Sequence, residues 1–298
     1  MKASKSVRKK RGITVFDVIL IVILGLMSLI TIYPFYYVLI VSFSNVNAFG
    51  NHVPYLLPYV IDFEGYKVIF ADFSFLQAFF NSVFVTVVGS LLNMLLSICG
   101  AYALSKKRLV GRGLFLSLIL FTMLFSGGLI PYYLVVSGMG LTNSLWSMIL
   151  PTAINTFYLI IMKNYFVSLP PSLEEAAKID GAHDLTILFR IILPISMPFI
   201  ATFFLFYAVE RWNEWWNALL FINEKAKQPL QIYMRELLVS FNSALAQQAI
   251  SVISQNQKAN FQSIQMATIV VSTVPILCVY PFIQKHFVKG VMVGSVKE

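Results

Sequence analysis

Long apolar runs alternate with short polar segments along the whole chain of 298 residues. A helix that crosses a membrane needs about 20 mostly apolar residues. Uncharged runs of at least about that length occur at 18–39, within 73–105, across 113–162, at 191–209 and at 266–283. The run 113–162 is long enough for two passes, because turn-forming residues at 137–144 divide it. The pattern therefore predicts an all-α membrane protein with six transmembrane helices.

Composition and charge agree with this pattern. Hydrophobic residues make up 58% of the chain and charged residues only 12%, whereas soluble domains carry about 25% charged residues. Of the 22 Lys and Arg, six precede the first run, four follow the second, three follow the fourth and three follow the sixth. Because positive residues favour the cytoplasmic ends of spans, both termini are predicted in the cytoplasm. The net charge of +9 then reflects basic residues beside membrane spans, where anionic lipid headgroups attract them, and no nucleic-acid partner is expected.

This topology divides the chain into three expected parts. They are a basic cytoplasmic N-terminus, a six-helix domain and a cytoplasmic tail, at residues 1–14, 15–286 and 287–298. Two outer loops, at about 44–72 and 211–265, and one inner loop, at about 163–194, join the spans. Residues 234–254 have a helical hydrophobic period. The helix predicted there docks a partner or packs on the outer ends of the protein's own helices.

The inner loop holds the densest charge of the chain, in the stretch SLEEAAKIDGAHD at 172–184. Ser172 followed by Glu175 has the form of a capping box, and Gly181 suits a helix stop because it adopts positive φ at little cost. A helix of about two turns is predicted at Leu173–Asp180. One face of it is formed by Leu173, Ala176, Ala177 and Asp180. Because so short a helix is marginal alone, its small-residue face predicts a groove that holds it, and the alternative is a solvated linker.

The spacing within this loop is specific. Glu175-Ala176-Ala177, then Gly181, then Ile191-x-Leu193-Pro194 reproduces the EAA motif of permease subunits in ATP-binding-cassette (ABC) importers. Further segments that resemble carbohydrate-importer permeases are NSVFVTVV, GAYALSK, NTFYLIIMKNYF, LPISMP and RWNEWW. The chain most resembles the maltose-type, MalG-like permeases, and FSGGLIPYYL resembles the LplC-like branch associated with oligosaccharides and polysaccharides.

The resemblance implies a type I ABC importer permease arrangement in which a short cytoplasmic EAA helix, the coupling helix, sits in a cleft of the ATPase. The ATPase-coupling residues that it implies are Glu174, Glu175, Ala176, Ala177, Asp180, Gly181 and Pro194. The tail resembles one that reaches into the ATPase dimer, and its implied contacts are Lys289, Gly290, Gly294 and Lys297. The final Glu298 departs from the usual small ending, and the alternative is a basic tail held by lipid.

The resemblance also implies partners and a location. The partners are a second, homologous permease subunit in a heterodimer, two ATPase subunits that bind ATP and Mg²⁺, an extracellular solute-binding protein or lipoprotein, and a carbohydrate. The location is the bacterial plasma membrane. This chain lacks the GxxxxGK[ST] phosphate loop, so it is expected to be a non-catalytic subunit with no cofactor of its own.

A sugar pathway needs hydrogen-bonding groups and aromatic faces around a water-filled cavity. The candidates are Asn81, Asn93, Tyr132, Tyr133, Asn155, Tyr158, Trp212, Asn213 and Trp216. Each can equally join packed helices, and the cluster Glu210–Trp216 also fits an interfacial aromatic belt. In maltose-type systems most sugar contacts belong to the partner permease, so this chain is expected to line the path more than to bind the cargo.

Two other classes of protein fit the sequence less well. An ion-driven secondary transporter needs an ionisable residue inside a span, and the six runs contain none. A membrane enzyme needs a nucleophile with a base or a metal cluster. The three histidines are scattered, and HExxH and Gly-x-Ser-x-Gly are absent. The particular glycan stays open.

Overall fold

The computed structural model describes residues 14–45, 57, 60–248 and 262–278. All regular elements in these residues are helical, and one isolated antiparallel bridge joins Ser44 and Ile61. The all-α prediction is therefore confirmed for the described part of the chain. The chain divides into two units, residues 1–67 with 253–270, and residues 68–252 with 271–298.

The first unit contains the long apolar helix α1, Val15–Ser42. Its start is fixed by Thr14, whose hydroxyl accepts from the Asp17 N–H at 3.3 Å while the Asp17 carboxylate accepts from the Thr14 N–H at 2.8 Å. At its end, Ser42 accepts a hydrogen bond from the Tyr66 hydroxyl at 2.8 Å. Tyr66 belongs to α2, Glu64–Ala71, in the first predicted outer loop.

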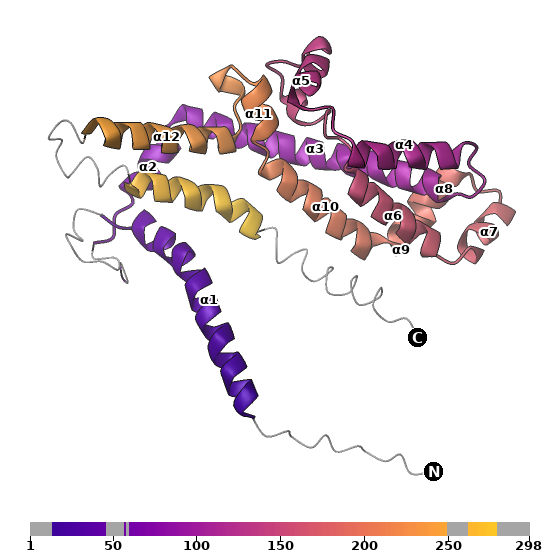
Figure 1. Ribbon diagram of the computed structural model, residues 1–298, viewed down its shortest axis with the longest axis horizontal. Helices are drawn as coiled ribbons and strands as arrows, with labels where there is room; N and C mark the ends of the chain where they lie inside the picture. Colours follow the sequence, from indigo (N-terminus) through magenta and orange to yellow (C-terminus); the bar gives the residue numbers. More distant parts are fainter. Residues whose placement is uncertain (1–13, 46–56, 58–59, 249–261, 279–298) are drawn as a thin grey trace. The chain divides into compact units, whose positions relative to one another are not determined.

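The second unit is built around α3, Phe73–Ser105, which packs against α6, Thr156–Ser168, and α10, Met197–Trp212. Figure 1 shows α6 and α10 running alongside α3. The core between these helices includes Met94, Ile98, Met162, Phe203 and Tyr207. The predicted second span is thus the central helix of this unit.

The first part of the run 113–162, which is the third predicted span, is interrupted. It forms α4, Arg112–Leu124, and α5, Leu129–Gly138, which are bent by 119° relative to each other. The break falls on Phe125–Gly128, where Gly128 has a φ of +85° that interrupts helical geometry. Hydropathy does not register this break, because the residues around it remain apolar.

The predicted turn at 137–144 is present, with positive φ at Gly140 and Asn143. It leads through the 3₁₀ turn η2, Leu145–Met148, to α6. Asn155 caps α6 by accepting from the N–H groups of Phe157 and Tyr158 at 3.1 and 3.3 Å. The fourth apolar run therefore contributes a helix of only 13 residues.

The fifth run is also bent. Helix α8, Asp184–Ile187, continues through a π-helical segment, Leu188–Ile192, into α9, Leu193–Ile195, and α10 then starts after a 90° bend at Ser196. The Pro on each side of Ser196 explains the bend, because proline removes helical N–H donors and clashes with the preceding turn. The sixth run forms helix Gln262–Cys278, and its last predicted residues, 279–283, lie outside the described residues.

Of the described helices, α1 and α3 are long and apolar enough to cross a membrane, and up to four spans result if each bent pair counts as one. The count of six spans and the orientation of the termini remain predictions.

The described part of the second predicted outer loop includes α11, Trp216–Phe221, the 3₁₀ turn η4, Lys225–Lys227, and α12, Leu230–Gln248. The predicted amphipathic helix is confirmed as helix up to residue 248 and begins four residues earlier than expected. Its start is joined to α3, because the Leu230 N–H donates to the Ser82 hydroxyl at 2.8 Å. Of the two alternatives for this helix, the contact favours packing on the protein's own helices over docking of a partner, at this end of α12.

Candidate functional site

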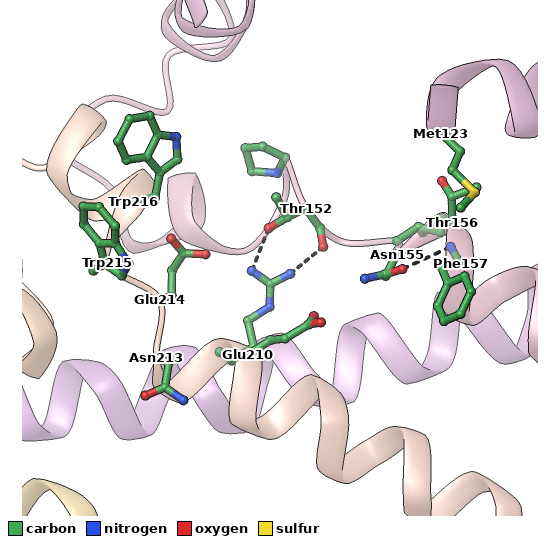
Figure 2. A pocket seen from close by; sticks show the side chains of 13 residues that line it. Met123, Thr152, Asn155, Thr156, Phe157, Glu210, Asn213, Glu214, Trp215 and Trp216 are labelled. Atoms are coloured by element: carbon green, nitrogen blue, oxygen red, sulfur yellow. Dashed lines mark hydrogen bonds between the residues drawn. The ribbon is translucent and has the colours of Figure 1, made fainter. Parts of the chain in front are cut away.

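A cavity of about 560 Å³ lies where the C-terminal end of α10 meets the segment that leads into α6. Its polar lining includes Thr152, Asn155, Glu210, Asn213 and Glu214, and its aromatic lining includes Phe157, Trp215 and Trp216. Figure 2 shows Glu214, Trp215 and Trp216 gathered at one end, Asn155 and Phe157 at the other, and Glu210 between them. We call this space the Glu210 cavity.

The turn between α10 and α11 places one end of the lining. Asn213 ends α10, and its side-chain amide donates back to the Val209 carbonyl at 2.9 Å. Glu214 accepts from the Asn217 N–H at 2.9 Å, so its carboxylate stabilises the start of α11. Trp215 and Trp216 follow directly, with their rings edge to face at 5.5 Å.

Arg211 also lines the cavity, although only 4% of its surface is exposed. The predicted outer loop begins at residue 211, whereas the structure places Arg211 in the last turn of α10. Its two terminal nitrogens donate to the Met148 carbonyl and to the hydroxyl and carbonyl of Thr152. The guanidinium therefore ties α10 to the segment that forms the cavity wall.

Asn93 of α3 completes the surroundings of this guanidinium. With its amide oriented to satisfy both groups, its oxygen accepts from Nε and Nη2 of Arg211 at 3.0 and 2.9 Å, and its nitrogen donates to the Gly89 carbonyl at 2.8 Å. All five N–H donors of Arg211 are then engaged, each by an uncharged acceptor. The approach is close, since a Cβ added at Gly89 would lie 3.0 Å from Cδ of Arg211.

Each of the two cavity carboxylates uses one oxygen inside the chain. Oε1 of Glu210 accepts from the Tyr158 hydroxyl at 2.6 Å, and Oε1 of Glu214 accepts from the Asn217 N–H. In the part of the chain that the structure describes, the second oxygen of each has no hydrogen-bond partner. These oxygens are therefore available as acceptors for a hydroxyl-bearing ligand.

The structure brings some of the predicted path residues together. Asn155, Asn213 and Trp216 line the Glu210 cavity, and Tyr158 contributes through its hydrogen bond to Glu210. The sequence-based candidates did not single out Glu210, Glu214 or Trp215, although all three belong to the ERWNEWW cluster. For Thr152 no local signal exists, because its role depends on Arg211, which lies 59 residues away.

The other candidates lie outside this lining and join parts of the chain. Asn81 donates to the carbonyls of Ala226 and Gln228 at 2.9 and 3.0 Å, and Tyr132 donates to Asn217 at 2.6 Å. Two aromatic rings are also engaged. Tyr133 stacks on Phe221 at 5.5 Å, and the buried Trp212 donates to the Ser272 carbonyl at 3.1 Å. A pathway role for these four residues remains a prediction.

The EAA stretch of the inner loop forms α7, Ser172–Ile179. The predicted capping box is wrong, because Pro171 is already helical, with φ −61° and ψ −28°, and precedes Ser172 as the N-cap. The N–H groups of Glu174 and Glu175 donate to the Pro171 carbonyl at 3.0 and 3.1 Å. Proline suits a helix start because its φ is preset and its missing N–H needs no partner there.

The predicted stop at Gly181 is confirmed. Gly181 has a φ of +77°, and its N–H donates to the Lys178 carbonyl at 3.0 Å. The N–H of Ala182 donates to the Ala177 carbonyl, also at 3.0 Å. Together these bonds form a Schellman motif, which ends the helix cleanly.

The predicted small-residue face of α7 divides between two surroundings. Ala177 is buried in the core cluster of its own chain, and Leu173 is half-buried. Ala176 and Asp180 are exposed, together with Glu175 and with Ile179, which is 87% exposed. The reason is geometric, since Ala176 and Ala177 are neighbours in sequence and point about 100° apart on a helix.

Ion pairs fix the base of this loop. The carboxylate of Glu174 pairs with Lys106, the residue that ends α3. Asp184 pairs with Arg108 and lies 3.8 Å from the ammonium of Lys178. Burial lowers the pKa of Lys106, and the hydrogen bond to Glu174 offsets part of this shift. Glu174 therefore has a partner within its own chain.

The remaining predicted coupling residues are placed only in part. Pro194 is exposed in α9. The tail contacts lie outside the described residues, and they are Lys289, Gly290, Gly294 and Lys297. Within the residues that the structure describes, no group of three or more His, Cys, Asp or Glu is arranged to hold a metal ion.

Comparisons with known proteins identify relatives of this chain. No protein-family model matches the chain. It is 46% identical over 282 residues to the polygalacturonan/rhamnogalacturonan transport system permease protein YtcP of Bacillus subtilis (strain 168), covering 95% of this chain and 98% of that protein. It is also 46% identical over 283 residues to Protein LplC of the same organism, covering 95% of each.

A solved structure agrees with these relatives. The chain is similar, with a TM-score of 0.83 and 35% identity, to a chain in the crystal structure of a bacterial ABC transporter involved in the import of the acidic polysaccharide alginate. The similarity covers 96% of this chain and 100% of that one. The helical fold is thus that of an ABC importer permease, an integral membrane protein. The chain belongs to the family of permease subunits of carbohydrate ABC transporters.

Proposed function

We propose that this chain is the transmembrane permease subunit of an ATP-driven importer for an oligosaccharide or complex glycan. It crosses a bacterial plasma membrane six times in the type I arrangement, with both termini in the cytoplasm. The family and the names of the relatives, which include a polygalacturonan/rhamnogalacturonan permease, support a carbohydrate substrate. The Glu210 cavity supports a pathway role, because it combines open carboxylate oxygens with two tryptophan rings.

The importer contains partners that supply what this chain lacks. A second, homologous permease completes the pathway as a heterodimer, and an extracellular solute-binding protein or lipoprotein delivers the sugar. Two ATPase subunits bind ATP and Mg²⁺ and hydrolyse the nucleotide, so this subunit is not an enzyme. The basic N-terminus, 1–14, and the tail, 287–298, lie on the cytoplasmic side, where the tail contacts the ATPases.

Coupling to the ATPase is assigned to α7. The observation that carries this assignment is its outward face, on which Glu175, Ala176 and Ile179 are all exposed. The opposite face is fixed to the chain by the buried Ala177 and by the pair of Glu174 with Lys106. A helix held on one side and open on the other can transmit movement of a bound partner to α3 as alternating access proceeds.

The proposal is tested by comparing Ile179→Asp with Val110→Asp. Both positions carry an exposed aliphatic side chain, 87% and 89% exposed, in segments predicted to be cytoplasmic. We expect Ile179→Asp to lower ATP-dependent sugar uptake by about tenfold, the loss typical of an interface anchor. The readouts are uptake into proteoliposomes, substrate-stimulated ATP hydrolysis and co-purification of the ATPase.

Val110→Asp serves as the matched control, and uptake within about twofold of the unmodified complex is expected, as for a surface substitution. Normal assembly and normal uptake with Ile179→Asp would remove α7 from the coupling role. Equal losses with both variants would show a general effect of charge on this side of the protein.

A further inference from the structure

The Glu210 cavity has an unbalanced set of charged groups. Two carboxylates, Glu210 and Glu214, line it, and among the described lining residues Arg211 is the sole cation. Arg211 is 4% exposed, and its five N–H donors are all taken by Met148, Thr152 and Asn93. It therefore has no donor left with which to bind an anionic group.

The charged groups that remain open in the cavity are acceptors. The second carboxylate oxygens of Glu210 and Glu214 have no partner among the described residues, whereas Oε1 of each is held by Tyr158 and by the Asn217 N–H. Such oxygens accept hydrogen bonds from hydroxyl groups. A carboxylate ligand offers only acceptors and a like charge, so it finds neither a hydrogen bond nor an ion pair with these two side chains.

The aromatic part of the cavity suits neutral and anionic sugar rings equally. Trp215 and Trp216 are each 45% exposed, and their rings are edge to face with an interplanar angle of 81°. Their flat apolar faces can pack against the C–H face of a sugar, while the indole N–H groups remain polar. The tryptophans can therefore hold a sugar ring, which leaves the neighbouring carboxylates as the groups that distinguish neutral from anionic sugars.

We infer that the Glu210 cavity accepts neutral, hydroxyl-bearing sugar units and discriminates against uronate units, whose carboxylates meet like charge and no free cation. This inference rests on the proposed function and specifies the substrate class at this site. It differs from what the names of the relatives suggest, because polygalacturonan and alginate are acidic glycans. Discrimination by a repulsive element is a common source of specificity.

The test uses two probes that differ only in oxidation at C6, linear galactotriose and trigalacturonate. The complete transporter is placed in lipid nanodiscs without binding protein, and probe affinity is measured by calorimetry and tryptophan fluorescence. We expect galactotriose to bind about tenfold more tightly than trigalacturonate at low salt, a difference of about 1.4 kcal/mol. Added salt should shrink the ratio, because ions screen repulsion between charges exposed to water.

Two variants assign this preference to the carboxylates. Glu210→Gln and Glu214→Gln keep the shape and the acceptor oxygen, and each should lower the ratio to about threefold or less, since each removes one of two repelling charges. Glu224→Gln is the matched control. Glu224 is 54% exposed, pairs with Lys227 at 2.9 Å and lies outside the cavity lining. Removing its charge should therefore leave the ratio of the two probe affinities unchanged.

Equal affinity for the two probes, a preference for trigalacturonate, or no binding of either probe would overturn the inference. An unchanged ratio in both glutamine variants would do the same. The proposed function is judged separately, by the effect of Ile179→Asp on ATP-dependent uptake. If the two probes bind equally well while Ile179→Asp still lowers ATP-dependent uptake, the inference about the cavity is rejected and the proposed function is not.

Discussion

Helices α1 and α3 are similar in composition and different in surroundings. Their most apolar windows have mean hydropathies of 2.8 and 2.1, yet none of the α1 window is buried within the chain and 39% of the α3 window is. The less hydrophobic helix is therefore the one around which a unit is built. Hydropathy indicates that a helix can cross a membrane, and it does not indicate what that helix packs against.

The difference arises from one face of α3. This face carries small and polar residues that are buried, namely Ser82, Gly89, Ser90, Asn93, Ser97 and Ala101. In lipid, apolar surface gives helices no reason to associate, whereas small residues allow close approach and polar ones form interhelical hydrogen bonds. In the exposed middle of α1, Ser28 and Thr31 bond to their own helix instead, to the Leu24 and Met27 carbonyls, each at 2.7 Å.

The largest expected effect comes from replacing one polar residue of each helix by leucine. Asn93→Leu removes the oxygen that accepts from two nitrogens of Arg211 and leaves buried donors unpaired. A loss of about 3 kcal/mol in the free energy of unfolding is expected for an unpaired buried charged group. The measurement is reversible unfolding of the purified subunit in mixed micelles.

Ser28→Leu in α1 is the control, and it should change this free energy by less than about 0.5 kcal/mol, as at an uncoupled surface site. Similar losses for the two substitutions would mean that burial of α3 does not depend on its polar face.

An intermediate effect is expected from the glycines. In Gly89→Val, Cβ lies 3.0 Å from Cδ of Arg211 and two further methyl groups need space. The cost of overpacking is about 1–3 kcal/mol, and the unfolding midpoint should fall accordingly. In Gly25→Val of α1 the added Cβ meets nothing within 4 Å. An equal shift at Gly25 would contradict the contrast between the helices.

The comparison also shows how far the sequence predicts the fold. Hydropathy predicts α1 and α3, and the glycine at position 181 predicts the end of α7, because both signals are local. The bends at Phe125–Gly128 and Ser196 are missed, since apolar residues continue on both sides and a hydropathy window averages across them.

The candidate site is predicted to a smaller extent for a related reason. The ERWNEWW cluster is visible in the sequence, and it supplies much of the lining of the Glu210 cavity. The burial of Arg211 is not visible, because its acceptors on Thr152 and Asn93 lie on segments far away in the sequence. Only the packed structure shows that this arginine is fully engaged and that the glutamates are not.

The smallest expected effect concerns the hydrogen bond of 2.7 Å between the hydroxyls of Ser97 in α3 and Tyr207 in α10. A double-mutant cycle with Ser97→Ala and Tyr207→Phe should give a coupling energy of about 0.6 kcal/mol, the average for hydrogen bonds between membrane helices. The cycle is needed because Tyr207 also accepts from the Asn155 N–H at 3.2 Å, so the single substitution at Tyr207 removes more than one contact. Thr31→Ala in α1 is the comparison, since the Thr31 hydroxyl donates to the Met27 carbonyl of its own helix at 2.7 Å. A coupling energy of zero would mean that this hydrogen bond does not help to hold α3 against α10, and the contact of Asn93 with Arg211 would then carry the polar contribution of α3 to this helix pair.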